Sequence, residues 1–130
     1  MLSYQSALTT FVKIKNPPLY YRDGLVALTL LKNGYFVFAK RLALHALIQN
    51  QEYVLPYQVL SYANFLTHNR ESAKDYFLKL ADFDTKNTSL YKFLIGISYY
   101  RYGDYEQSIL YLTQVTDPGL QIDVYRYMLL

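Results

Sequence analysis

The chain has 130 residues, enough for one domain with a substantial core, and it has no cysteine, which excludes disulfides and thiolate chemistry. Hydrophobic residues make up 52% of the sequence and charged residues 18%, and tyrosine occurs 16 times, which suits half-buried helix faces and contact surfaces. The net charge of +3 comes from scattered basic residues, which argues against a nucleic-acid-binding protein.

No apolar run approaches the roughly 18 residues that a membrane-spanning helix requires, so no membrane span is expected in this chain. The starting stretch MLSYQSALTTFVK lacks the basic region and continuous apolar core of a signal peptide. These two observations favour a cytoplasmic location without fixing the compartment.

Apolar residues recur at helical spacing along the chain, and no stretch alternates with the period of a strand, which predicts an all-α fold. The breaks between helices contain proline, glycine, asparagine or aspartate, which end helices or form turns. Helices are predicted at 4–15, 19–32, 35–48, 55–67, 70–81, 89–102, 105–115 and 121–130. The stretch 117–119, Asp-Pro-Gly, is expected to be a firm stop between the last two.

The clearest helix–turn–helix unit is SYYRYGDYEQS, which spans residues 98–108. Gly103 can take the left-handed conformation that ends many helices. Asp104 is expected to cap the following helix, with Gln107 returning a hydrogen bond to the Asp104 backbone N–H, as in a capping box.

Small residues recur with a constant period. Ala39, Ala73 and Ser108 lie 34 and 35 residues apart, and another small residue lies 12 positions before each of them. These earlier residues are Ala27, Ser61 and Gly96, and they follow the aliphatic residues Val26, Leu60 and Ile95. Such pairs allow two antiparallel helices to approach closely. The other inward positions of the second helices are predicted to be Ala43, Ala46, Phe77, Leu80, Leu112 and Val115.

This pattern resembles the tetratricopeptide repeat (TPR) family, whose units of about 34 residues are helix–turn–helix pairs that stack into a superhelix. The best match is GISYYRYGDYEQSILYLTQV at 96–115, followed by NRESAKDYFLKL at 69–80 and by Ala27, Gly34, Phe36 and Ala39. The chain departs from the family at its tryptophan place, where Asp23, Tyr57 and Lys92 stand, and at its proline place, where Gln51, Thr85 and Leu120 stand.

The resemblance implies a right-handed α-solenoid in a single domain. Its parts are a flanking helix at 4–19, repeats at 20–53, 54–88 and 89–120, and the start of a terminal helix at 121–130. The helix at 4–15 carries Ala7, Phe11 and Ile14 in the places of a second helix of an earlier unit.

The resemblance also implies a concave groove lined by the first helix of each unit. The residues at the family's contact places are Tyr21, Leu28, Leu31, Lys32, Gln58, Tyr62, Phe65, Leu66, Phe93, Ile97, Tyr100 and Arg101. This apolar, aromatic set suits an amphipathic helix or a hydrophobic peptide. Gly24 and Leu28 stand where family members that bind chaperone C-termini have polar residues, so binding of chaperone tails is not expected. The alternative is that these side chains pack against a neighbouring helix or against the chain's own last helix.

The two histidines, His45 and His68, lie in different repeats with no nearby carboxylate pattern, so neither a metal site nor an acid–base role is expected. The sequence contains no carboxylate pair placed for catalysis, no phosphate-binding glycine loop and no serine nucleophile motif, so neither an enzyme nor a cofactor is expected.

The predicted function is a non-enzymatic protein-interaction module or scaffold whose partner is a protein or peptide with an apolar segment. The alternative is a structural piece of a longer solenoid, or a homo-oligomer that associates through its terminal helices or groove. The ending Tyr127-Met128-Leu129-Leu130 favours this alternative because it is apolar, whereas solenoids normally end in a polar capping face.

Overall fold

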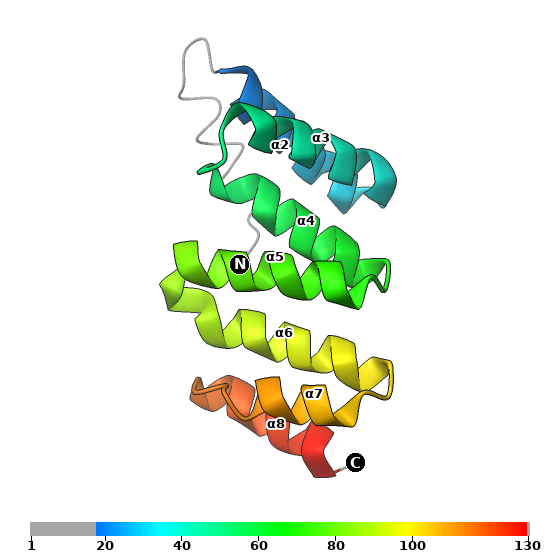
Figure 1. The fold of residues 1–130 in the computed structure, drawn as a ribbon, viewed down its shortest axis with the longest axis vertical. Helices are drawn as coiled ribbons and strands as arrows, with labels where there is room; N and C mark the ends of the chain where they lie inside the picture. The colour runs from blue at the N-terminus through cyan, green and yellow to red at the C-terminus, as the bar shows by residue number, and fades with distance from the viewer. Residues whose placement is uncertain (1–17, 130) are drawn as a thin grey trace. The chain divides into compact units, whose positions relative to one another are not determined.

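The computed structural model describes the backbone of residues 18–129 and the side chains of residues 18–124. Seven α-helices and one short 3-10 helix occupy this part of the chain, and no strand occurs in it (Figure 1). The prediction of an all-α fold is therefore confirmed for the described residues. The helix predicted at 4–15 and the side chains of the apolar ending at 127–130 lie outside them.

The chain divides into two compact units, the first ending at Thr67 and the second beginning at His68. The first unit contains α2 (Leu19–Lys32), α3 (Phe36–Gln49) and α4 (Val54–Leu66). The second contains α5 (Arg70–Phe83), the 3-10 helix η1 (Thr85–Asn87), α6 (Thr88–Arg101), α7 (Tyr105–Leu112) and α8 (Pro118–Leu129). The division falls inside the stretch 54–88 that the sequence pattern assigns to one repeat.

In the first unit, α2 and α3 form an antiparallel pair, and α4 packs against both of them (Figure 1). Ala27 on α2 and Ala39 on α3, which form the predicted small pair, are completely buried. Lys40 on α3 donates a hydrogen bond of 3.0 Å from its Nζ to the hydroxyl of Thr67, at the end of α4. The unit is therefore a three-helix layer in which small side chains fill the contact between α2 and α3.

In the second unit, α6 contacts α5, α7 and α8. The Ser108 hydroxyl on α7 donates a hydrogen bond of 2.8 Å to the Gly96 carbonyl on α6. A Cβ atom placed on Gly96 would lie 2.5 Å from the Cδ2 atom of Leu112. The predicted small pair at 96 and 108 therefore marks a close approach of α6 and α7. All six predicted inward positions of the second helices are buried, namely Ala43, Ala46, Phe77, Leu80, Leu112 and Val115.

Two helix ends have the same hydrogen-bonded turn, known as a Schellman motif. After α2, Gly34 has a φ of +83° and donates to the Leu31 carbonyl, while the next N–H donates to the Leu30 carbonyl. After α6, Gly103 has a φ of +78° and donates to the Tyr100 carbonyl, while the next N–H donates to the Tyr99 carbonyl. The prediction of a left-handed Gly103 is confirmed.

His68 follows α4 with a φ of +66°, although it is not a glycine. Among the described residues, positive φ occurs at Gly34, His68 and Gly103. These three residues lie 34 and 35 positions apart, which is the spacing of the small-residue pairs. The left-handed backbone positions and the small side chains therefore follow one period, and the described helices have a repeat-like arrangement.

The capping of α7 is partly as predicted. The Oδ1 atom of Asp104 accepts a hydrogen bond of 3.3 Å from the Gln107 N–H, so Asp104 caps this helix. The second half of the predicted capping box is wrong, because the Asp104 N–H donates to the Tyr99 carbonyl and is not available to the Gln107 side chain.

The boundaries of the last two helices also differ from the prediction. Helix α7 ends at Leu112 rather than at 115, because the N–H groups of Gln114 and Val115 donate three residues back, as in a 3-10 turn. Helix α8 begins at Pro118 rather than at 121. Proline is tolerated at the first helical position, and the Oδ1 atom of Asp117 caps the helix by accepting from the next two N–H groups at 3.0 and 3.1 Å.

Candidate interaction surfaces

Three tyrosines meet where α2 begins and α4 begins. The Tyr53 ring stacks on Tyr21 with centroids 5.7 Å apart and meets Tyr20 edge-on at 5.3 Å. Gly24 makes room for them, since a Cβ atom there would lie 2.6 Å from the Cε2 atom of Tyr53. Burial, followed by the neighbouring Tyr21 and Tyr20, raises the pKa of the Tyr53 hydroxyl. The three rings are half-buried, so they form a partly accessible, uncharged aromatic surface.

Most of the predicted groove residues lie in the first unit, on α2 and α4, which contact each other. Lys32 and Leu66 are exposed, and the half-buried residues are Tyr21, Gln58, Tyr62 and Phe65. Burial raises the pKa of Tyr62 to about 12, so its hydroxyl is neutral at physiological pH. These six residues form the first-helix face, the name used below for this surface of the first unit.

The other predicted groove residues lie on α6 in the second unit. Arg101 is exposed, and Tyr100 is half-buried with its ring edge-on to Tyr105 at 5.5 Å. Phe93 and Ile97 are buried.

Four of the predicted groove residues are core residues in the structure, which corrects the prediction. They are Leu28, Leu31, Phe93 and Ile97. The reason is that α2 and α6 carry apolar side chains on more than one face, so the position in a repeat does not tell which of them a neighbouring helix covers.

A polar cluster joins α2 to α3, and it corrects the expectation that His45 has no carboxylate nearby. The Nδ1 atom of His45 lies 2.8 Å from the Oδ2 atom of Asp23, and the Gln49 amide donates to the same oxygen at 2.9 Å. A carboxylate that orients an imidazole occurs in acid–base sites. In the residues described, no group of three or more His, Cys, Asp or Glu side chains could hold a metal ion. What the cluster does here is link the two helices.

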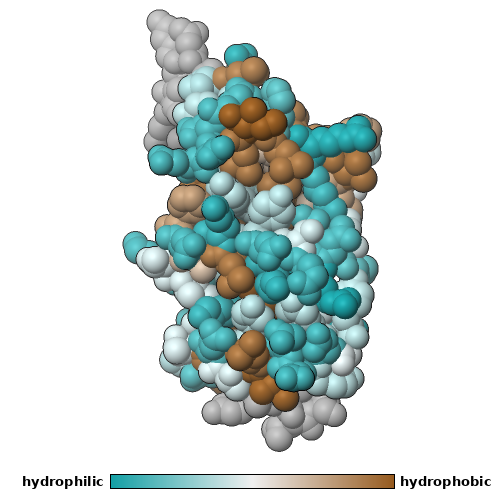
Figure 2. All heavy atoms as spheres, in the orientation of Figure 1, coloured by the Kyte–Doolittle hydropathy of each residue, from teal (hydrophilic) through white to brown (hydrophobic). Residues whose placement is uncertain are grey.

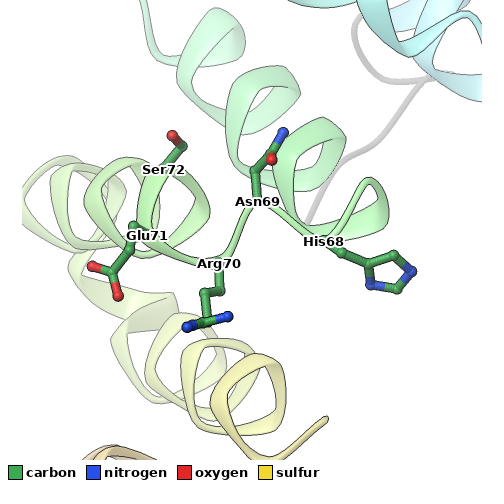
Figure 3. Close-up of a pocket in the computed structure, with 5 residues that line it drawn as sticks. All are labelled: His68, Asn69, Arg70, Glu71 and Ser72. Atoms are coloured by element: carbon green, nitrogen blue, oxygen red, sulfur yellow. The ribbon is translucent and has the colours of Figure 1, made fainter. Parts of the chain in front are cut away.

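A shallow hollow lies at the start of α5 and is lined by residues 68–72 (Figure 3). The Arg70 guanidinium lies over the Tyr102 ring, 4.6 Å from its centroid, and the Tyr102 hydroxyl donates to the His68 carbonyl. Glu71 accepts hydrogen bonds from Tyr99 at 2.7 Å and from Lys74 at 3.0 Å, and these bonds, the one from Tyr99 first, lower its pKa. The charged side chains of this hollow, Arg70 and Glu71, thus contact other residues of the second unit.

Sequence reasoning missed the tyrosine cluster and the contact between Asp23 and His45. Both join residues more than 20 positions apart, so no local pattern reveals them. One signal was present, because glycine inside a helix is unfavourable unless something packs closely against it, and Gly24 lies inside α2 under Tyr53.

In the part of the chain that the structure describes, no helix is long and apolar enough to cross a membrane. Comparisons with protein families, with curated proteins and with solved structures found no match to this chain.

Proposed function

We propose that this chain is a TPR-like helical-repeat protein, a right-handed solenoid that acts as a non-enzymatic scaffold for another protein. The observation that carries this proposal is the common period of two unrelated features. Left-handed backbone positions at Gly34, His68 and Gly103 keep the spacing of the small-residue pairs. Repeat proteins of this kind present extended surfaces that bind partners.

The first-helix face is the proposed site, and its ligand is an apolar or amphipathic helical segment. It offers aromatic rings and Leu66, which is 49% exposed, with one cation, Lys32, at the end of α2. Aromatic anchors surrounded by apolar contact dominate the binding energy of most protein interfaces.

Titration of a synthetic amphipathic helix, with leucine every three or four residues and glutamine elsewhere, tests this site. Leu66→Gln and Tyr62→Ala are each expected to weaken binding about fivefold, since burying an apolar side chain contributes about 1 kcal/mol or more. The matched control is Ile109→Gln on α7, because Ile109 is also 49% exposed. Unchanged affinity in both variants, with unchanged thermal melting, would contradict the assignment.

The second candidate function is self-association, and two exposed apolar residues favour it. Val26 on α2 and Ile122 on α8 are both at least half exposed. In that case the mass measured by light scattering rises with protein concentration, and Val26→Gln with Ile122→Gln restores the monomer. A monomeric mass at every concentration would eliminate this alternative.

A further inference from the structure

The outer face of α3 is unusually apolar. Val37, Phe38, Leu44 and Ile48 are 60%, 58%, 44% and 79% exposed, whereas the face that α3 buries carries alanines. A surface helix normally places its large apolar side chains toward the core and polar ones toward water. Figure 2 shows hydrophobic residues gathered in the upper part of the view, where Figure 1 shows α3. Helix α3 is therefore apolar on both sides, which is typical of a helix that is covered on both sides.

The repeat period shows that the fold itself does not require these residues. The positions that correspond to Val37, Phe38 and Ile48 in the next two repeats are all polar. They are Glu71, Ser72 and Asp82 in the second repeat, and Glu106, Gln107 and Asp117 in the third. Val37, Phe38 and Ile48 thus stand where the other two repeats have polar residues, so another reason for these three side chains is needed.

The spacing of these side chains fits a second helix. Val37, Arg41, Leu44 and Ile48 follow one another at intervals of four, three and four residues, and Phe38 lies beside the first of them. Residues at such intervals form one stripe along a helix, and a stripe of this kind packs against a stripe on a partner helix.

The charge of α3 indicates the chemistry of the partner. Its ionisable residues are Lys40, Arg41 and His45, and it contains no acidic residue. Lys40 bonds to Thr67 and His45 to Asp23, whereas neither of the ion pairs found among the described side chains includes Arg41. Arg41 lies within the exposed stripe. An α3 helix from a second copy has no acidic side chain to complement it, whereas an acidic partner helix would do so.

We propose that the outer face of α3 docks an amphipathic helix of another protein, with a leucine-rich stripe flanked by aspartate or glutamate. This surface is separate from the first-helix face, and it would remain a docking site if the first-helix face bound nothing. Val37, Phe38, Leu44 and Ile48 supply the apolar contact, and Arg41 selects the acidic flank.

The test is a titration of the full chain with three synthetic helices that share a leucine stripe and differ in their flanks, which are glutamate, glutamine or lysine. The glutamate helix is expected to bind tightest and the lysine helix weakest. Combined Val37→Gln, Phe38→Gln and Ile48→Gln should weaken binding of the glutamate helix at least tenfold. The matched control is Tyr105→Gln, Ile109→Gln and Leu110→Gln, which removes three large, exposed side chains from α7.

The single change Arg41→Glu keeps the test decisive if the triple variant does not fold. It should invert the preference, so that the lysine helix binds more tightly than the glutamate helix. Unchanged preference would overturn the proposal, as would failure of the glutamate helix to bind at about 1 mM. Loss of binding in Leu66→Gln but not in the α3 variants would leave the first-helix site in place and eliminate the α3 site.

Two other occupants give results that would also overturn the proposal. If α3 instead binds a lipid surface, the chain should bind vesicles of phosphatidylcholine and phosphatidylserine more tightly than the glutamate helix, and Arg41→Glu should abolish vesicle binding. If α3 instead binds a second copy of the chain, the protein should form dimers, and the triple α3 variant should be monomeric.

Discussion

At the scale of single residues, His68 stands where the two equivalent turns have Gly34 and Gly103, and it has the same left-handed backbone. A side chain in this conformation costs about 1–2 kcal/mol, because its Cβ atom crowds the backbone. His68 also packs its ring edge-on to Tyr102, with centroids 6.0 Å apart. The residue therefore combines a backbone cost with a side-chain contact.

His68→Gly is expected to raise the free energy of unfolding, by about 0.5–1 kcal/mol after loss of the ring contact. His68→Ala is the matched control, since it loses the same contact but keeps a Cβ atom at positive φ. Urea denaturation of both variants measures the difference. The glycine variant should be the more stable of the two by about 1 kcal/mol, and an alanine variant of equal or greater stability would contradict the strained turn.

Adding a single methyl group at Gly96 should destabilise the fold strongly. Its added Cβ atom would lie 2.5 and 2.6 Å from two Leu112 side-chain atoms and 3.4 Å from the Leu112 backbone N. Gly96→Ala is therefore expected to lower the free energy of unfolding by about 1–3 kcal/mol, despite the better helix propensity of alanine. Gly119→Ala, at the start of α8, should change it little. A neutral Gly96→Ala would contradict the close approach of α6 and α7.

Residues whose role depends on neighbours in the sequence could be predicted. The turn glycine Gly103 and the capping residue Asp104 were predicted correctly, because their chemistry acts within a few positions. The Asp23–His45 contact and the burial of Leu28 could not be predicted in this way. Both depend on which helices become neighbours, and that is decided by packing over the whole unit.

At the scale of helices, α5 and α6 are joined near both ends by a tyrosine that donates to a carboxylate. Tyr99 donates to Glu71 near the start of α5, and Tyr91 donates to Asp84 just after its end, both at 2.7 Å. The hydrogen bond from Asn87, followed by the one from Tyr91, lowers the pKa of Asp84. The Glu71 side chain is 63% exposed and screened by water, so the bond between the buried Tyr91 and Asp84 should contribute more.

Because folding lowers the pKa of both carboxyl groups, the unfolded chain binds more protons in acid. Their stabilisation is fully present above the unfolded pKa values of about 4 and is lost as pH falls through the lower folded values. Tyr91→Phe should reduce the free energy of unfolding at neutral pH by about 1–2 kcal/mol and flatten its decline between about pH 5 and pH 2. Thermal melts across this range measure the effect, with Tyr105→Phe as the control. If the stability of Tyr91→Phe falls with pH as steeply as that of the original chain, the hydrogen bond from Tyr91 to Asp84 does not contribute to the acid sensitivity.

Helix positions were largely predictable from the sequence, and the faces that helices expose were less so. The predicted helix at 19–32 matches α2, because proline and glycine mark both of its ends. The early start of α8 was missed because a proline between two helices has two interpretations. It can mark a break, as predicted for 117–119, or it can be the first residue of the next helix, as Pro118 is. The apolar outer face of α3 was missed because apolar residues at helical spacing indicate a helix but do not show which of its apolar sides a neighbouring helix covers.

At the scale of the whole molecule, one period runs through features that packing and backbone geometry impose separately. The small pairs, the left-handed turns and the buried inward positions keep it, whereas Val37, Phe38 and Ile48 on α3 are apolar where their equivalents are polar. The proposed scaffold function rests on the shared period. The separate proposal of a docking site on α3 rests on the departures from that period.

Isotope-labelled protein titrated with the glutamate-flanked leucine helix, with backbone amide chemical shifts recorded by NMR, tests the interaction function most directly. We expect shift changes gathered on α3, including the amides of Val37, Arg41 and Ile48, with smaller changes on α2 and α4. Changes confined to α5–α8, or none at about 1 mM peptide, would contradict the claim that the first unit binds a partner helix.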